Sequence, residues 1–333
     1  MLTKIHIHNL LTFGDMSLNL CPGINLVVGE NGTGKTQLLK WIYAFSDKYW
    51  PLSGNSETLR AQGPIGIFGI VFSAMLREKA DGVCELSNED GVLGRVNVTY
   101  GPPIQTRYDR SGHRSPPPIL PAVFIPVKDM LTHANGLLAM SAKYTMPFDS
   151  TLLDIIETAS AWALKDIPAL GQAVLTQIET VIGGKVLYES DTFYVQKADG
   201  KKVHFYLEAE GYKKFALLWQ LIMNGSIADG ALVLWDEPDA NINPRHIPVL
   251  VEILLALQRN GVQMVLTTHS YLFAKYMEVR KKADDHLLFH SLYQGEQGVA
   301  CAKSETFGAL AHNDIQTAFL DLLGEVYDMD MGD

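Results

Sequence analysis

Apolar and polar residues follow regular periods along much of the 333-residue chain. In the last third the period switches between that of a helix and that of a buried strand. The predicted elements are helix 211–224, strand 232–236, helix 246–259, strand 263–267 and helix 271–279. Such alternation requires crossover connections, so it predicts a parallel sheet with helices packed against it. The fold class is therefore α/β.

The first two thirds of the chain are richer in strand patterns. Strands are predicted at 4–10, 16–20, 24–28, 67–73, 82–99, 104–108, 122–127, 185–190, 193–197 and 203–209, and a helix at 35–46. Helical periodicity covers 150–182, with a break near Pro168 and Gly171. The closing residues 328–333 are acidic, and we expect them to be disordered.

Residues 29–36 have the spacing G-x-x-x-x-G-K-T between predicted strand 24–28 and predicted helix 35–46. A phosphate chain needs several backbone N–H donors aimed at one point, and glycines let the backbone curl that closely. The helix that follows adds the positive end of its dipole. Lys35 would bridge the β- and γ-phosphates, and Thr36 would coordinate Mg²⁺. The alternative is a glycine-rich turn that binds nothing. The predicted nucleotide-binding residues here are Gly29, Glu30, Asn31, Gly32, Thr33, Gly34, Lys35, Thr36 and Gln37.

Two predicted strands of the last third end in polar side chains. Asp236 and Glu237 end one strand, and His269 follows the next. Ligands in open α/β sheets bind beyond the carboxyl ends of the strands. We predict that Asp236 holds Mg²⁺, that Glu237 polarises the attacking water, and that His269 senses the γ-phosphate or positions that water. The alternatives are a strand end that merely turns and a structural histidine.

Composition limits the partners and the location. A net charge of −10 argues against a sequence-independent nucleic-acid coat. The sequence has no apolar run of about 18 residues or more, so we expect no membrane span and no membrane partner. The N-terminus reads as a strand rather than a signal peptide. Cys21, Cys84 and Cys301 are scattered and show no metal-ligand spacing. They suit a reduced compartment, so we expect a cytoplasmic protein.

The phosphate loop at 29–36, the strand that ends in Asp236 and Glu237, and the strand that leads to His269 occur in this order. Together they resemble the head of an ABC-class ATPase. The resemblance is to the SMC, RecF and OLD group, closest to compact phage-defence ATPases, and it covers nearly the whole chain. It is also carried by "DEP" followed by "NINP" (236–244), "FIPVKDML" (124–131), "MPFDSTLLDII" (146–156) and "LAHNDIQTAFLDLL" (310–323). It implies a P-loop NTPase fold with a mixed β-sheet, an antiparallel β subdomain and a helical insertion. Residues 1–333 would form one domain, with 130–205 as a lid-like insertion of helices and strands.

In that family two heads sandwich ATP, and the signature motif of one head touches the γ-phosphate held by the other. The resemblance therefore implies ATP and Mg²⁺ as cofactors, ATP hydrolysis, and a homodimer or higher homo-oligomer. The signature is assigned to "EAEGYKK" (208–214), with Gly211 and Lys213 as nucleotide contacts and Lys214 as a second candidate charge. Asn241 falls in the family's inter-subunit loop, and the region around 127–129 in its glutamine loop.

One departure from the family pattern concerns the signature. Ala209 stands where the family usually has a serine, so one hydroxyl donor is missing. That change puts the strength of ATP-driven dimerisation in doubt, and with it the rate of turnover.

Three functions follow from these observations. In the first, ATP-driven dimerisation controls a separately encoded effector, such as a nuclease, in anti-phage defence. In the second, the chain is a DNA-repair or recombination head that binds DNA directly, as RecF-like and SMC-like heads do. The net charge of −10 and the lack of a heptad array long enough for an extended coiled coil weigh against this second function. In the third, motivated by Ala209, it is an ATP-binding scaffold without turnover.

Overall fold

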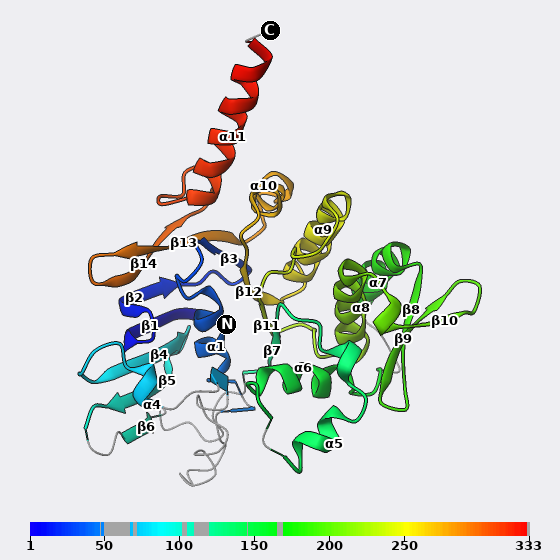
Figure 1. Cartoon of the computed structure of the whole chain (residues 1–333), viewed down its shortest axis with the longest axis horizontal. Helices are drawn as coiled ribbons and strands as arrows, with labels where there is room; N and C mark the ends of the chain where they lie inside the picture. The colour runs from blue at the N-terminus through cyan, green and yellow to red at the C-terminus, as the bar shows by residue number, and fades with distance from the viewer. Residues whose placement is uncertain are drawn as a thin grey trace.

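The computed structural model describes residues 1–46, 48–49, 67–68, 72–101, 105–109, 120–144, 146–164 and 169–331. Within these residues the strands form two sheets. Eleven strands form the larger one, in the order β6-β5-β4-β1-β2-β14-β13-β3-β12-β11-β7, and three form the smaller one, in the order β10-β9-β8. Figure 1 shows the large sheet extending from the left side to the middle of the molecule and the small sheet at the right, beyond helices α7 (Ala169–Ile182) and α8 (Glu210–Met223).

The parallel part of the large sheet positions the candidate site. It consists of β7 (Ala122–Ile125), β11 (Leu232–Trp235), β12 (Gln263–Thr267), β3 (Ile24–Gly29) and β13 (Leu287–Gly295), each parallel to its neighbour. Every residue of β3, β11 and β12 is buried. Strands covered on both faces are expected to be continuously apolar, which is why these segments are recognisable in the sequence.

A wing of mostly antiparallel strands, in which β14 and β2 pair in parallel, extends the sheet on the other side of β13. Its strands are β1 (Leu2–Leu10), β2 (Phe13–Asn19), β4 (Gly82–Asn88), β5 (Gly91–Thr99), β6 (Gln105–Asp109) and β14 (Gly298–Ser304). Apolar residues from this wing pack with helix α1 (Lys35–Tyr43), in a core that includes Phe13, Leu38 and Trp41. Helix α1 thus leads from the phosphate loop into a second core.

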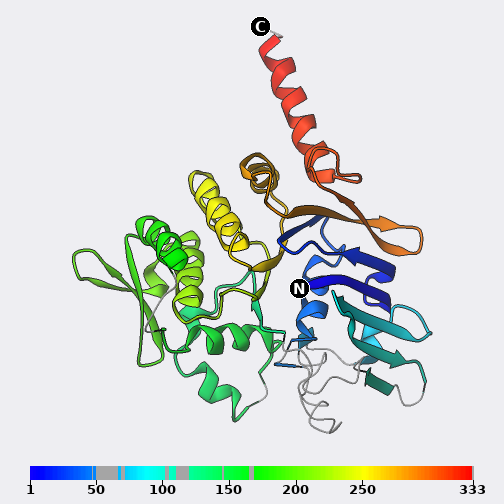
Figure 2. The same ribbon diagram turned by 180° about the vertical axis from the view of Figure 1, so that it is seen from behind.

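Helices and the small sheet form the other side of the molecule (Figures 1 and 2). Helices α6, α7, α8 and α9 share one large core with the parallel strands. The remaining elements are α4 (Phe72–Met75), α5 (Leu137–Ser141), α6 (Thr151–Ala159), α7 (Ala169–Ile182), β8 (Gly184–Glu189), β9 (Thr192–Lys197), β10 (Lys202–His204), α8 (Glu210–Met223), α9 (Ile247–Gln258), α10 (Tyr271–Arg280), α11 (Asp314–Met331) and 3₁₀ turns at Leu131–His133, Phe205–Leu207 and Pro244–His246.

This architecture confirms the predicted fold class. The large sheet mixes parallel and antiparallel pairs, and the small sheet is antiparallel and separate. Residues 130–205 contain α5, α6, α7 and the small sheet, while the division of the chain into a head and an insertion stays a prediction. No helix in the described ranges is both long and apolar enough to cross a membrane.

Several local predictions are wrong. Residues 67–68 and Phe72–Met75 are helical rather than strand, because a short buried apolar run does not distinguish the two. The strand predicted at 203–209 ends at His204, whose ring nitrogen accepts a hydrogen bond from the Tyr206 N–H and closes a 3₁₀ turn. Helix α11 continues to Met331, so residues 328–331 are not disordered. The helix predicted over 150–182 is interrupted as expected, since α6 ends at Ala159 and α7 begins at Ala169, but Gly171 lies inside α7 and Pro168 is outside the described residues.

Candidate functional site

The predicted phosphate loop runs from the end of β3 to the start of α1. Two of its glycines are required by the geometry. A Cβ on Gly29 would lie 2.3 Å from the Leu292 carbonyl oxygen, and one on Gly34 would lie 2.5 Å from the Thr12 hydroxyl. Gly34 also has a φ of 86°, which L side chains rarely adopt. The loop can therefore pass this close to its neighbours only with glycine at both positions.

The Lys35 side chain curls back over the same loop. Its ammonium donates hydrogen bonds to the carbonyl oxygens of Gly29 at 2.8 Å and Glu30 at 2.9 Å. Burial lowers the pKa of Lys35 to about 8, against the opposing effect of the Glu237 and Asp236 carboxylates. The loop thus holds a lysine whose charge is only partly neutralised by its surroundings and is available to an anion.

The carboxylate of Asp236 meets the start of α1. The Thr36 hydroxyl donates to Asp236 Oδ2 at 2.7 Å, across 200 positions in the chain. The Thr267 hydroxyl donates to Asp236 Oδ1 at 2.6 Å and accepts from the Glu237 backbone N–H at 3.0 Å. A hydroxyl and a carboxylate at this spacing form the kind of oxygen pair that holds Mg²⁺ together with a nucleotide's phosphates. Sequence reasoning missed Thr267, although it ends the strand that leads to His269.

Glu237 and His269 lie next to each other at the open edge of this site. His269 Nε2 is 3.5 Å from Glu237 Oε1, and the two side chains are about one third exposed. Glu237 has a φ of 49°, an uncommon conformation for a residue that is not glycine and one that clusters at functional sites. Burial and the Lys35 ammonium lower the pKa of His269, so its ring is neutral at pH 7. A carboxylate beside a neutral imidazole can accept a proton from water.

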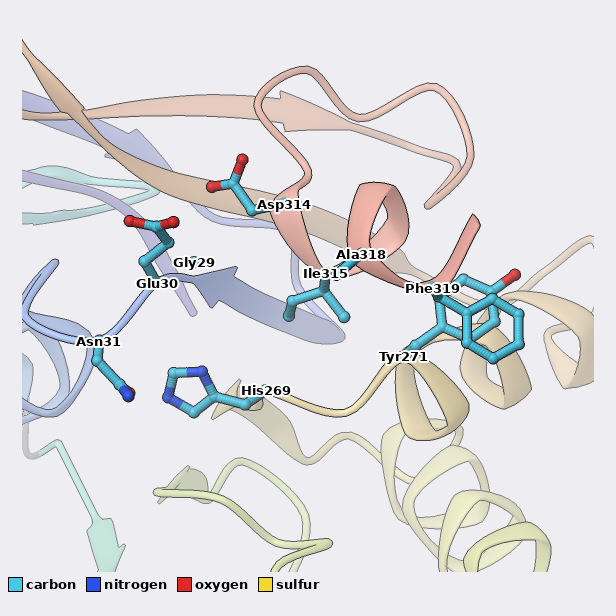
Figure 3. Close-up of a pocket in the computed structure, with 9 residues that line it drawn as sticks. All are labelled: Gly29, Glu30, Asn31, His269, Tyr271, Asp314, Ile315, Ala318 and Phe319. Carbon is cyan, nitrogen blue, oxygen red and sulfur yellow. The ribbon is translucent and has the colours of Figure 1, made fainter. Parts of the chain in front are cut away.

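A cavity of roughly 650 Å³ lies beside the phosphate loop (Figure 3). The loop and His269 form one side of it, and the first turns of α11 with the first residue of α10 form the other. Its lining residues are Gly29, Glu30, Asn31, His269, Tyr271, Asp314, Ile315, Ala318 and Phe319. The last five are absent from the sequence-predicted site. Four of these five lie in the tail 310–323, which carried part of the family resemblance but was given no role, and Tyr271 begins the predicted helix 271–279.

Two family models match parts of the chain. Residues 139–274 match "AAA domain, putative AbiEii toxin, Type IV TA system", and residues 4–94 match "AAA domain". A stretch of 45 residues is 38% identical to the DNA replication and repair protein RecF of Limosilactobacillus reuteri. That stretch covers 14% of this chain and only 12% of the RecF protein.

Solved structures match over almost the whole chain. The SMC head domain from Thermotoga maritima superimposes with a TM-score of 0.52 at 14% identity, over 92% of this chain and 99% of that one. An SMC head bound to the C-terminal domain of ScpA, from Pyrococcus furiosus, gives 0.52 at 10% identity, over 98% and 99%. The chain has the fold of an SMC- and RecF-like ABC-type ATPase head. The resemblance inferred from the sequence is confirmed at this level.

In this fold, the segment assigned to the signature lies against the predicted inter-subunit loop. Helix α8 begins at Glu210, and a Cβ on Gly211 would lie 2.9 Å from the Asn241 carbonyl oxygen. Asn241 is exposed and has a φ of 62°. Gly211 and Asn241 are therefore packed together within one chain, and their place at a dimer interface stays a prediction.

The two lysines of the signature segment have different surroundings. Lys213 is buried, and its ammonium lies 2.7 Å from Glu210 and 3.4 Å from Asp129. Lys214 instead donates to the Glu237 carbonyl oxygen at 2.5 Å, and burial lowers its pKa to about 8. Of the two, Lys214 is the one that the fold brings to the Asp236–Glu237 turn. Nucleotide contact by Lys213 stays a prediction.

The lowered pKa of Lys35 predicts how nucleotide affinity depends on pH. The ammonium is charged below about pH 8 and neutral above it, and an anion binds the charged form. If only that form binds, affinity for ATP should fall roughly tenfold between pH 7 and pH 9, measured by titration calorimetry with excess Mg²⁺. A Lys214→Met variant is the control, because Lys214 titrates in the same range. If the decline disappears in that variant, Lys214 and not Lys35 is responsible.

Proposed function

We propose that the chain binds and hydrolyses ATP with Mg²⁺, and that ATP-driven association of two copies controls a separately encoded effector in anti-phage defence. The observation that carries this proposal is the meeting of the Thr36 hydroxyl and the Asp236 carboxylate, 2.7 Å apart. It brings the phosphate loop and the Asp-Glu strand into one site with Lys35 between them. The match to a model described as a putative AbiEii toxin supports a role in defence.

Each side chain has a role in this proposal. Thr36 and Asp236 would hold Mg²⁺, which when bound neutralises charge on the phosphates. Thr267 fixes the orientation of the Asp236 carboxylate through its 2.6 Å hydrogen bond. Glu237 accepts the proton of the attacking water, and neutral His269, 3.5 Å away, orients that carboxylate or the water itself. Lys35 stabilises the charge that develops on the transferred phosphoryl group.

A protein partner is preferred over DNA for two reasons. The chain carries a net charge of −10, which opposes binding to a polyanion. Similar SMC heads have also been solved with a protein, ScpA, bound to them. The 45-residue match to RecF, a DNA replication and repair protein, keeps direct DNA binding as the alternative function.

One assay separates these functions. Release of phosphate from ATP is measured with and without duplex DNA, at low salt where non-specific binding is strongest. We expect Mg²⁺-dependent turnover that DNA does not change. Turnover that DNA stimulates would favour the repair-type head, and ATP binding without turnover would indicate a scaffold.

The trans role of the signature segment gives a further prediction. Gly211→Asp would place a carboxylate at the start of α8, against the γ-phosphate of ATP bound by the other copy. Each head should still bind ATP, because Lys35 and Thr36 are untouched, while dimer formation and hydrolysis should fail. Gly211→Ala is the control, since its Cβ meets the same Asn241 carbonyl oxygen at 2.9 Å without adding charge. Light scattering with ATP and a phosphate assay measure both effects.

Mixing two inactive variants tests whether the site is shared. A dimer of Gly211→Asp with Lys35→Ala has one phosphate loop and one signature intact, and they face each other only if they act in trans. Each mixed dimer has one good site of two, so at most about half of the parental turnover should return. If mixed dimers form and remain inactive, a single composite site does not support turnover.

A further inference from the structure

Helix α11 extends away from the rest of the molecule (Figures 1 and 2). Its first turns are anchored, because Ile315 packs against the large core and the Phe319 ring stacks on Tyr271 with centroids 3.8 Å apart. Beyond Phe319 the large apolar side chains are exposed. Their exposed fractions are 52% for Leu320, 54% for Leu322, 47% for Leu323, 46% for Val326, 64% for Tyr327 and 76% for Met329.

The apolar residues of α11 have the spacing of a helix that packs along another helix. Five of them, Ile315, Phe319, Leu322, Val326 and Met329, are separated by four, three, four and three positions, while Leu320, Leu323 and Tyr327 lie outside this repeat. This 3.5-residue repeat forms one seam along the helix, which we call the α11 seam. Its first two members contact the head, and the last three are exposed. The exposed part therefore has the pattern of a helix–helix interface. No helix among the described residues of this chain covers it.

The charges beside the α11 seam indicate which helix would fit. Asp321, Glu325 and Asp328 each come directly before an exposed seam residue, so they lie along one flank of the seam. Helix α11 contains no lysine or arginine. Asp328 lies in the last turn of α11, where a negative charge opposes the helix dipole, so it does not stabilise α11 itself. A second copy of α11 would bring only like charges to this flank, whereas a helix with lysine or arginine there would be attracted.

We propose that the exposed part of the α11 seam docks an amphipathic helix of a partner protein, with apolar residues on its own seam and lysine or arginine along its flank. This inference rests on the proposed function, because it takes the partner to be the effector. Asp314, Ile315, Ala318 and Phe319 of the same helix line the cavity beside the phosphate loop (Figure 3). The docking surface and one wall of this cavity therefore belong to the same helix.

A pair of designed peptides tests the chemistry of the partner. Both are amphipathic helices of about four heptads with leucine at the seam positions, one with lysine and one with glutamate on the flanks. The full-length protein is titrated into each labelled peptide, and binding is followed by fluorescence anisotropy. The lysine peptide should bind at least tenfold more tightly than the glutamate peptide. Equal affinities would overturn the proposed charge preference.

Variants of α11 test whether the seam is the docking surface. Leu322→Ser combined with Val326→Ser should weaken binding of the lysine peptide at least tenfold. Leu320→Ser is the matched control, because Leu320 is as exposed as Leu322 but lies away from the seam. If Leu320→Ser has the same effect, or the double variant has none, the α11 seam is not the docking surface. The peptide then binds without using the seam, for example through the protein's overall negative charge, and the proposal fails.

Two further measurements separate this inference from its alternatives. Light scattering without nucleotide reports whether the parental protein self-associates. A dimer that dissociates in the Leu322→Ser, Val326→Ser variant would make a second copy the occupant and overturn the proposal. Phosphate release by this variant alone should equal that of the parent, because neither residue lines the cavity. If the parent releases no phosphate yet its seam binds the lysine peptide, the proposed ATPase activity fails and the docking surface stands.

Discussion

Lys35→Ala is expected to weaken ATP binding by about 30- to 1000-fold. The substitution removes the ammonium that lies over the phosphate loop, donating to the Gly29 and Glu30 carbonyl oxygens. A charged hydrogen bond to phosphate in a partly dry site contributes roughly 2–4 kcal/mol, which corresponds to this range of affinity. The two carbonyl oxygens also lose their partner, so the loop is less well ordered before the nucleotide arrives. Titration calorimetry with Mg²⁺ and ATP measures the loss directly.

The control for this prediction lies on the same helix. Lys40 is also part of α1, but its ammonium pairs with Asp149 at 2.9 Å. Lys40→Ala removes an equal charge from the same helix and should leave ATP affinity within a few-fold of the parent. Parental affinity in Lys35→Ala would show that the loop does not hold the phosphates through this lysine.

Glu237→Gln should reduce turnover by roughly 10² or more while ATP still binds. The amide keeps the size of the side chain but cannot take a proton from water. The backbone of Glu237 would be unaffected, because its N–H donates to Thr267 and its carbonyl oxygen accepts from Lys214. Single-turnover phosphate release isolates the chemical step, and light scattering with ATP should show the bound dimer accumulating.

Glu252→Gln is the matched control for the loss of turnover. Glu252 has a similar exposed fraction, 38% against 32% for Glu237, but pairs with Arg280 on the surface. Its conversion to glutamine should leave the rate unchanged. If Glu237→Gln hydrolyses ATP at the parental rate, another residue activates the attacking water. His269 would then be the next residue to substitute.

The phosphate loop, the Asp236–Glu237 pair and His269 could be predicted from the sequence because each is a local signal. Each follows a buried apolar strand, and parallel strands deliver the residues at their carboxyl ends to one edge of a sheet. The pairing of β3 with β12, and of β12 with β11, brings these residues together as expected. The strands predicted at 67–68, 72–73 and 205–207 are helical turns instead, because short apolar runs leave helix and strand undecided until tertiary packing decides.

The contacts that complete the site required the tertiary structure. Thr267 is an ordinary strand residue in the sequence, and only the β11–β12 register places its hydroxyl on Asp236. Lys214 reaches the turn at Glu237 from helix α8, and the start of α11 faces the phosphate loop although it follows that loop by about 280 residues. A period along the chain reports which face of an element is buried, but not which element buries it. The sheet order and the directions in which α8 and α11 leave it supply that information, and they depend on packing throughout the chain.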